Sequence, residues 1–256
     1  MGRACAWRVA STVDTIVLID RDEAGLHSIA NELAHHTEVV PITADITDPA
    51  LMGALTPHLE HGSLRAVAHA AGVSPTMASW REIIRVDLIA TALIIDALSP
   101  FVTAGTAAVC FASMSAFLIA RDDNPTIEAA LDDPLSAAFL DHLRRAAGPA
   151  IEEPGVAYAW AKRGVQRLVR RVAIEWGRRG GRICSISPGM IDTPQGRQES
   201  AAHPSMAMLL ARTPLQREGT ADEVGGVVSF LLSDQASFVT GTDVLVDGGV
   251  CATVER

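Results

Sequence analysis

Short apolar runs rich in β-branched residues alternate with longer helical stretches along the whole chain. Six runs have the length and composition of buried strands: 15–20, 38–45, 64–72, 107–113, 181–187 and 242–249. Apolar residues at helical spacing predict helices between them, over 3–11, 22–35, 48–60, 79–99, 156–178 and 221–232. This alternation is typical of a doubly wound parallel α/β sheet, whose strands are apolar on both faces.

The chain shows no internal repeat and no linker, so we predict one domain over residues 1–256. One segment, 117–156, breaks the rhythm because it contains prolines and no strand. Leu135, Phe139, Leu140 and Leu143 have helical spacing there. We expect a helical insertion of one or two short helices, and a lid over a binding site is one interpretation of it.

Charge and composition exclude several classes of function. The 21 basic and 30 acidic residues give a formal charge of −9, which disfavours a nucleic-acid partner. No apolar run is long enough to span a membrane, and no signal peptide is evident. The four cysteines form no CxxC pair and the histidines no metal-ligand spacing, so we expect buried free thiols, no metal and a cytoplasmic location.

The stretch YAWAK places Tyr158 and Lys162 one helical turn apart on the same face. A nearby ammonium favours the phenolate, which predicts a lowered tyrosine pKa and a general acid or base. The spacing alone is weak evidence, because a tyrosine and a solvated lysine on an amphipathic helix give the same pattern. However, Tyr158 is the only tyrosine, and Ser113 ends a predicted strand at the sheet edge where such folds build their sites.

Together with the turns HAAG (69–72), SISPGMIDTP (185–194) and VDGG (246–249), these residues resemble the short-chain dehydrogenase/reductase family from Gly2 to Gly249. Within it the chain is most similar to the bacterial 3α-hydroxysteroid dehydrogenase/carbonyl reductase group, which has a helix-rich segment between its serine and tyrosine. The resemblance implies a Rossmann-like fold and hydride transfer between NAD(H) and a secondary alcohol or ketone.

The resemblance implies specific catalytic roles. Tyr158 would exchange a proton with the substrate, Lys162 would lower the pKa of Tyr158 and bind the nicotinamide ribose, and Ser113 would hydrogen-bond the reacting oxygen, with Ser115 as the alternative. The family has an asparagine where this chain has Asp87. Asp87 would either hold a water that relays protons to Lys162 or cap a local irregularity of the helix, and both readings stay open.

Other matching positions are implied to bind the cofactor. Asp20 would accept hydrogen bonds from both adenosine ribose hydroxyls and repel a 2′-phosphate, which favours NAD over NADP, although Arg21 could pair with that phosphate. Asp45 and Ile46 would contact the adenine. Further positions are implied to surround the cofactor: Gly2 at the phosphates, Ala71 and Gly72 in a turn passing close to it, and Pro188, Gly189, Ile191 and Thr193 over the nicotinamide. His69 replaces a family asparagine and is expected to be a core or turn histidine.

Gly2 matches the last glycine of the family's TGxxxGxG turn, so the first strand and most of that turn are absent. We expect a gap of about 9–10 Å, two strand spacings, at the centre of the sheet. Two explanations stay open: the protein starts upstream of Met1, or it is a natural truncation that binds dinucleotide poorly.

The predicted substrate is an apolar compound such as a steroid or terpenoid. Met114, Phe117, Met190 and the insertion would wall its cavity, with the segment 203–215 as a mobile cover, although methionines equally often fill a core. A homodimer or homotetramer is expected, through the long helices 79–99 and 156–178 or the last strand. The rival prediction is a non-catalytic binding protein on the same fold, which lacks the pyrophosphate cradle.

Overall fold

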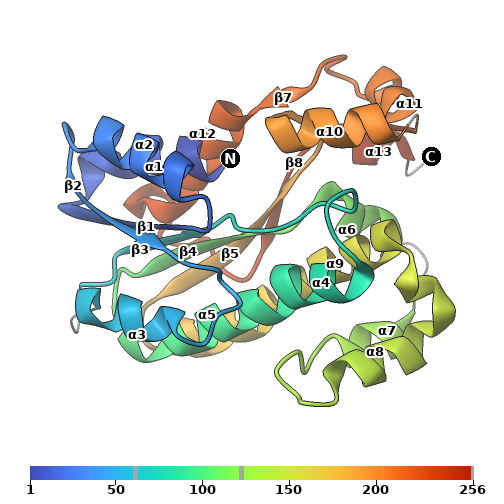
Figure 1. The fold of residues 1–256 in the computed structure, drawn as a ribbon, viewed down its shortest axis with the longest axis horizontal. Coiled ribbons are helices and arrows are strands. Elements are labelled where there is room, and N and C mark those ends of the chain that lie inside the picture. The colour runs from blue at the N-terminus through green and yellow to red at the C-terminus, as the bar shows by residue number, and fades with distance from the viewer. Residues whose placement is uncertain (60–62, 121–123, 204, 255–256) are drawn as a thin grey trace.

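Parallel strands form the centre of the molecule, and helices cover both of their faces (Figure 1). The computed structural model describes residues 1–59, 63–120, 124–203 and 205–254. Three sets of strands are hydrogen-bonded: β1 (Thr15–Asp20) with β2 (Glu38–Thr43); β3 (Ala66–His69), β4 (Ala107–Phe111), β5 (Arg182–Pro188) and β8 (Asp243–Val246) in that order; and β6 (Ile191–Asp192) with β7 (Gly219–Thr220). All pairs are parallel, so the predicted doubly wound α/β fold is confirmed.

The β1–β2 pair and the four-stranded sheet are separate ladders. Among the described residues, no strand pairing joins β1 or β2 to β3. The absence of the family's first strand stays a prediction.

Strand β4 is apolar throughout because both of its faces are buried. Ala108 and Cys110 pack into a core with the helices on one face, α4 (Trp80–Ile84), α5 (Thr91–Leu98) and α9 (Pro154–Arg178). Ala107, Val109 and Phe111 pack into a second core on the opposite face, with α1 (Gly2–Val9) and α12 (Ala221–Leu232). Neighbouring β4 residues therefore face opposite cores, as the two-residue period of a strand requires. The helix α2 (Glu23–Leu33) covers β1 and β2 in a third cluster.

The helix predicted over 79–99 is interrupted. A π-helical turn, Arg85–Ala90, separates α4 from α5. A π-turn holds one residue more than an α-turn, and such turns often lie at functional sites. Asp87 lies within this turn and is fully buried.

The insertion is ordered where it is described, and residues 121–123 lie outside the described part. After α6 (Met114–Ile119) come α7 (Pro125–Ala130), α8 (Phe139–Ala147) and the 3₁₀ turn Gly148–Glu152, as the one-or-two-helix prediction requires. Five side chains of this region belong to the main core: Ile127, Leu131, Phe139, Leu143 and Ile151. Leu135, predicted to share their apolar face, is instead exposed.

An ion-pair network fixes the insertion to α9. Glu128 and Asp132 lie four residues apart and face arginines spaced four apart on α9, namely Arg163, Arg167 and Arg171. Arg167 bridges both carboxylates, at 2.7 Å from Glu128 and 2.6 Å from Asp132. The insertion therefore packs on the outer face of α9 and does not cover the sheet edge, which argues against the lid interpretation (Figure 1).

The C-terminal part forms the upper side of Figure 1 with α10 (Pro194–Ala202), α11 (Ser205–Arg212) and α13 (Val250–Val254). The residues that follow α11 pack against Gly248 and Gly249, whose φ angles are +64° and +89°. A Cβ atom on Gly249 would lie 2.9 Å from Pro214 Cγ, so this contact requires glycine.

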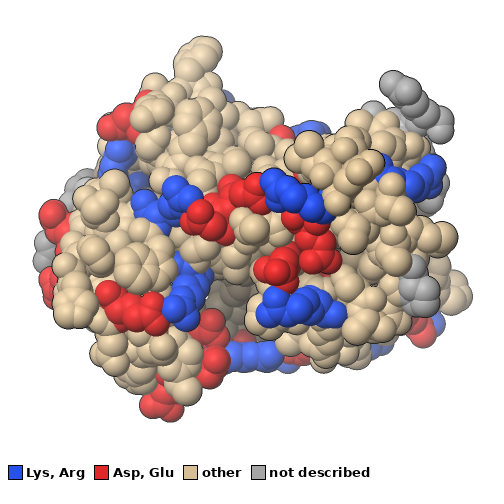
Figure 2. All heavy atoms as spheres, turned by 90° about the horizontal axis from the view of Figure 1, so that it is seen from above, with Lys and Arg blue, Asp and Glu red and all other residues tan. Residues whose placement is uncertain are grey.

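Figure 2 looks onto the upper side, where acidic and basic side chains lie next to one another around a hollow. Two ion pairs join elements through the first turn of α12: Arg8 of α1 pairs with Asp222, and Arg217 pairs with Glu223. No helix in the described ranges is both long and apolar enough to cross a membrane. All four cysteines are buried and none of them forms a disulfide with another, as predicted.

Candidate active site

The carboxyl ends of the central strands bring together the predicted serine, tyrosine and lysine. Ser113 follows β4 and caps α6, its Oγ accepting the Ser115 amide at 3.2 Å. The Tyr158 side chain hydrogen-bonds Ser113, and Lys162 Nζ lies 5.5 Å from the Tyr158 ring centroid. Lys162 also donates to the Phe111 carbonyl at 3.1 Å. The Ser115 hydroxyl contacts Ser113 Oγ at 3.0 Å, so Ser115 supports the serine that faces Tyr158.

The pKa of Tyr158 is opposite to the sequence prediction. Burial raises it above its ordinary value, and the negative charges of Asp87 and Glu199 raise it further. The hydrogen bond from Ser113 acts in the other direction. The prediction of a lowered pKa considered only the lysine one turn away, and it is wrong for this structure because desolvation of a phenolate outweighs that attraction.

Asp87 reaches this site from the π-turn. Its Oδ1 accepts the Val73 amide at 2.8 Å, and its Oδ2 lies 3.7 Å from Lys162 Nζ. The second contact is an ion pair that is too long for a hydrogen bond. Burial raises the pKa of Asp87, and Lys162 opposes that rise. Asp87 therefore holds the turn 69–73 through the Val73 amide and also faces Lys162. Both roles left open by the sequence, the water relay and the cap of the helix itself, stay predictions.

The turn 69–73 is shaped by the same pair. A Cβ atom on Gly72 would lie 2.9 Å from Asp87 Oδ1 and 3.2 Å from Lys162 Nζ. Asp87 and Lys162 therefore require glycine at this position by themselves. Ala71 is the preceding residue of this turn.

His69 is a core histidine, as predicted. It is buried, and its Nε2 lies 2.9 Å from the Thr91 hydroxyl. Burial, with a smaller effect of the Lys162 charge, lowers the pKa of His69 to about 4. The ring is therefore neutral at physiological pH.

Exposed acidic residues lie where the resemblance implies adenosine contacts. Asp20 ends β1, and its Oδ1 accepts the Asp22 amide at 3.0 Å. Asp45 Oδ1 accepts the Thr47 amide at 2.8 Å and its hydroxyl at 2.7 Å. These hydrogen bonds, with the nearby charges of Arg21 and Arg85, lower the pKa of Asp45. Asp45 is therefore an ionised acceptor at neutral pH.

Two other positions are implied to bind the cofactor, Ile46 at the adenine and Gly2 at the phosphates. Ile46, half-buried, packs against the main core, so only part of its side chain is left to contact a base. Gly2 opens α1, whose N-terminus has no side-chain cap. Uncapped helix N-termini attract anions.

The segment expected over the nicotinamide is fixed by backbone contacts. Pro188 ends β5, and a Cβ atom on Gly189 would lie 2.6 Å from Asp247 Cα. Ile191 is buried in β6, and Thr193 Oγ1 accepts the Gly196 amide at 3.0 Å as the cap of α10. Thr193 therefore has a structural role in addition to any cofactor contact.

Glu199 is a site residue that the sequence analysis missed. It lies on α10, and its charge acts on both Tyr158 and Asp87. Burial raises the pKa of Glu199 itself. Its surroundings in the sequence, RQESAAH, are polar and show no motif, so no signal distinguished this glutamate from a solvated helix residue.

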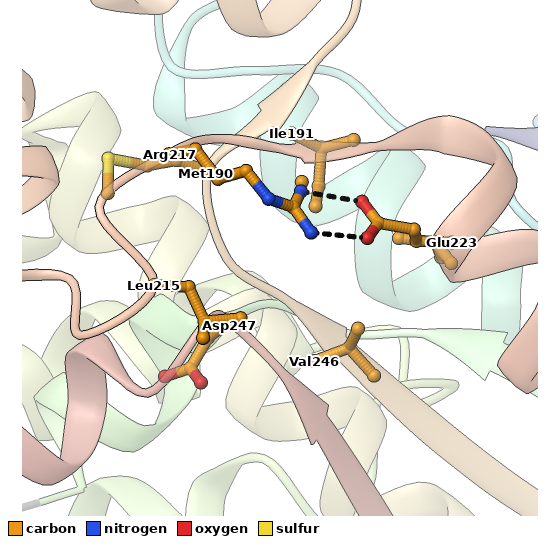
Figure 3. A pocket seen from close by; sticks show the side chains of 10 residues that line it. Met190, Ile191, Leu215, Arg217, Glu223, Val246 and Asp247 are labelled. Atoms are coloured by element: carbon orange, nitrogen blue, oxygen red, sulfur yellow. Dashed lines mark hydrogen bonds and ion pairs between the residues drawn. The ribbon is translucent and has the colours of Figure 1, made fainter.

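A small cavity of about 90 Å³ lies at the carboxyl end of β8, next to the β6–β7 pair (Figure 3). Apolar side chains and the Arg217–Glu223 ion pair line it, and Ser113, Tyr158 and Lys162 do not. Met114 and Met190 are buried in a cluster with α11 and α13 residues, and Phe117 packs against them. Met190 also lines the small cavity, whereas Met114 and Phe117 do not. The predicted apolar cavity between these three residues and the insertion stays a prediction.

Comparison with known proteins identifies the same family that the sequence motifs resemble. The family profile described as Enoyl-(Acyl carrier protein) reductase matches residues 1–130 and 145–251. A short-chain dehydrogenase/reductase of Alternaria brassicicola is 32% identical over 207 residues, which cover 76% of this chain and 71% of that protein. The 3-alpha-hydroxysteroid dehydrogenase/carbonyl reductase of Comamonas testosteroni is 29% identical over 191 residues, covering 72% of this chain and 71% of that protein.

Solved structures match over nearly the whole chain. The 3-alpha-hydroxysteroid dehydrogenase from Pseudomonas sp. B-0831, complexed with NADH, has a TM-score of 0.74 at 26% identity and covers 94% of this chain and 98% of that one. A 3-oxoacyl-[acyl-carrier protein] reductase from Brucella melitensis with bound NAD has a TM-score of 0.71 at 25% identity, covering 97% and 86%.

Proposed function

Because the chain belongs to the short-chain dehydrogenase/reductase family, a family of oxidoreductases, we propose that it transfers a hydride between NAD(H) and a hydrophobic secondary alcohol or ketone. One observation carries the proposal: Tyr158 is hydrogen-bonded to Ser113 with Lys162 beside it. In the reductive direction the Tyr158 hydroxyl donates a proton to the carbonyl oxygen, and Ser113 hydrogen-bonds that oxygen. Bound NADH would supply the hydride.

The chemistry of the donor set fits a dinucleotide. The exposed Asp20 carboxylate at the end of β1 suits a pair of ribose hydroxyls and repels a further phosphate, which supports NAD as the cofactor. The uncapped N-terminus of α1 suits the pyrophosphate. An apolar substrate is supported by Met208, which is exposed, and by the partly buried Leu209 and Leu210 of α11, which pack against the cluster of Met114 and Met190.

A cofactor-oxidation assay tests the proposal. Wild-type protein is given NADH or NADPH with a panel of hydrophobic ketones, and turnover with NADH is expected to exceed turnover with NADPH. Tyr158→Phe should abolish turnover because it removes the proton donor, while thermal stabilisation by NADH is retained. Stabilisation at one hundred times the dissociation constant should be about 2.7 kcal/mol.

Two results would contradict it. Retained turnover in Tyr158→Phe would exclude Tyr158 as the acid. NADH binding by wild-type protein without turnover of any ketone or alcohol would favour the rival, a binding protein on this fold.

A further inference from the structure

The Asp87–Lys162 pair is the part of the site whose chemistry is still unassigned. Asp87 is fully buried, and Lys162 is 4% exposed. The Val73 amide holds Asp87 Oδ1, while Asp87 Oδ2 has no hydrogen-bond partner in the described part of the chain and faces Lys162 Nζ at 3.7 Å. The carboxylate is thus aimed at the ammonium by its own backbone contact.

The other groups around Lys162 carry no charge at neutral pH. His69 is neutral because its pKa is lowered to about 4, and the Cys110 thiol is neutral because burial raises its pKa to about 12. The Phe111 carbonyl and the Tyr158 ring complete the surroundings. Asp87 is therefore the anion that balances the lysine among the described residues.

We propose that Asp87 is a positioning residue that cancels the charge of Lys162, so that Tyr158 keeps its proton to a higher pH than it would beside a neutral residue. Four groups act on the phenol from the elements around it: Ser113 from the start of α6, Lys162 from α9, Asp87 from the π-turn, and Glu199 from α10. Both carboxylates oppose its ionisation, and a lysine whose charge is already balanced attracts the phenolate less.

This electrostatic balance favours one role for the tyrosine. A protonated phenol is the form that donates a proton, which carbonyl reduction requires, whereas alcohol oxidation requires the phenolate. The site is thereby biased towards reduction near neutral pH. This consequence for turnover rests on the proposed function, but the effect of Asp87 on the phenol does not.

The single tyrosine of the chain makes a direct test possible. Phenolate absorbance is titrated in wild-type protein, in Asp87→Asn and in Asp96→Asn, with Tyr158→Phe as the blank. Asp87→Asn should lower the midpoint of Tyr158 by at least about one pH unit. Asp96→Asn makes the same chemical change at an exposed site on α5 and should leave the midpoint unchanged.

Asp87→Ser is measured in parallel, because its hydroxyl can also accept the Val73 amide if the asparagine variant does not fold. Circular dichroism confirms the fold of each variant at the start of the titration. A midpoint in the folded neutral variants equal to or higher than that of wild type would overturn the proposal. If wild type shows no phenolate before alkaline unfolding, a folded neutral variant that also shows none up to the same pH would overturn it.

Turnover gives a second readout. The acid limb of the kcat/KM profile for alcohol oxidation should move to lower pH in Asp87→Asn by the same amount as the titration midpoint. An unmoved limb in an active variant would overturn the proposal. If no protein turns over any substrate, the proposed function fails, while the absorbance titration still decides the role of Asp87.

Discussion

At the scale of single residues, burial shifts the pKa of a side chain more than a charged neighbour along the helix does. The phenol of Tyr158 has a cation one turn away, yet its pKa is raised because burial desolvates it and the charges of Asp87 and Glu199 add to that effect. His69 follows the same rule with the opposite charge type, because burial disfavours its imidazolium.

His69 predicts a pH-dependent stability. Its pKa is about 4 in the folded protein and about 6.5 when unfolded, so the unfolded state binds more protons between these values. Stability from the neutral ring is therefore fully present above pH 6.5 and is lost as the pH falls towards 4, by up to about 3 kcal/mol. Urea unfolding of wild-type protein and His69→Gln at pH 7 and pH 5 checks this.

The glutamine variant keeps a group able to hydrogen-bond Thr91 but does not titrate. Its free energy of unfolding should fall less between the two pH values than that of wild type. Equal losses in both proteins would show that other groups cause the acid sensitivity.

The sequence predicted which side chains come together at the candidate site better than it predicted their environment. Ser113, Tyr158 and Lys162 were found because a strand end and a one-turn spacing are visible in the letters. The contact between Asp87 and Lys162 depends on a π-turn and on residues 75 positions apart, and Glu199 approaches from a polar helix. No local pattern encodes either approach, and both carboxylates add to the rise in the Tyr158 pKa that burial causes.

At the scale of elements, α9 connects the site to the insertion. Its inner face carries Tyr158 and Lys162, and its outer face carries the arginines that hold Glu128 and Asp132. The side chains of this network are partly buried, with exposed fractions of 17% to 37%, so solvent screens them less than fully exposed pairs.

Removing both carboxylates of the network should therefore destabilise the protein measurably. We expect the double variant Glu128→Gln/Asp132→Asn to lose about 1–2 kcal/mol of unfolding free energy, and less at high salt. The single variant Glu152→Gln breaks a more exposed pair with Arg144 in the same insertion and should change stability by less than about 0.5 kcal/mol. Urea unfolding at low and high salt measures both changes. Equal losses of unfolding free energy in the two variants would show that the network stabilises the protein no more than an exposed ion pair does.

Element boundaries show where sequence patterns suffice. The run TIVLID was predicted as a strand over 15–20, and β1 has these bounds, because an isolated β-branched run has one interpretation. The sequence raised a helix irregularity at Asp87 only as one of two alternatives, because a single extra residue leaves the helical pattern of 79–99 almost unchanged. The two-residue strands β6 and β7 are too short to produce a pattern at all.

At the scale of the whole molecule, the strands differ in how firmly they are held. β4 is buried along its length and pairs on both sides, with β3 and β5. β1 pairs with β2 alone among the described strands. Regions with fewer ladder bonds open at lower free energy, so the molecule should not open as one unit.

Hydrogen exchange followed by mass spectrometry should resolve this difference. Peptides covering 107–111 are expected to exchange through global unfolding, and peptides covering 15–20 faster, with weak dependence on denaturant. Peptides from β5, which also pairs on both sides, serve as the control and should match β4. Identical protection of β1 and β4 would contradict this prediction.

The π-turn has a consequence for insertions and deletions. The π-turn Arg85–Ala90 holds one residue more than an α-helical turn. Deleting one residue there would therefore leave a continuous α-helix in which α4 and α5 keep the same sides towards the core. The same deletion within α5 would rotate the following Leu98 out of the core by about 100°. A shortened π-turn is thus compatible with the packing of the fold. It would, however, displace the carboxylate of Asp87 from Lys162.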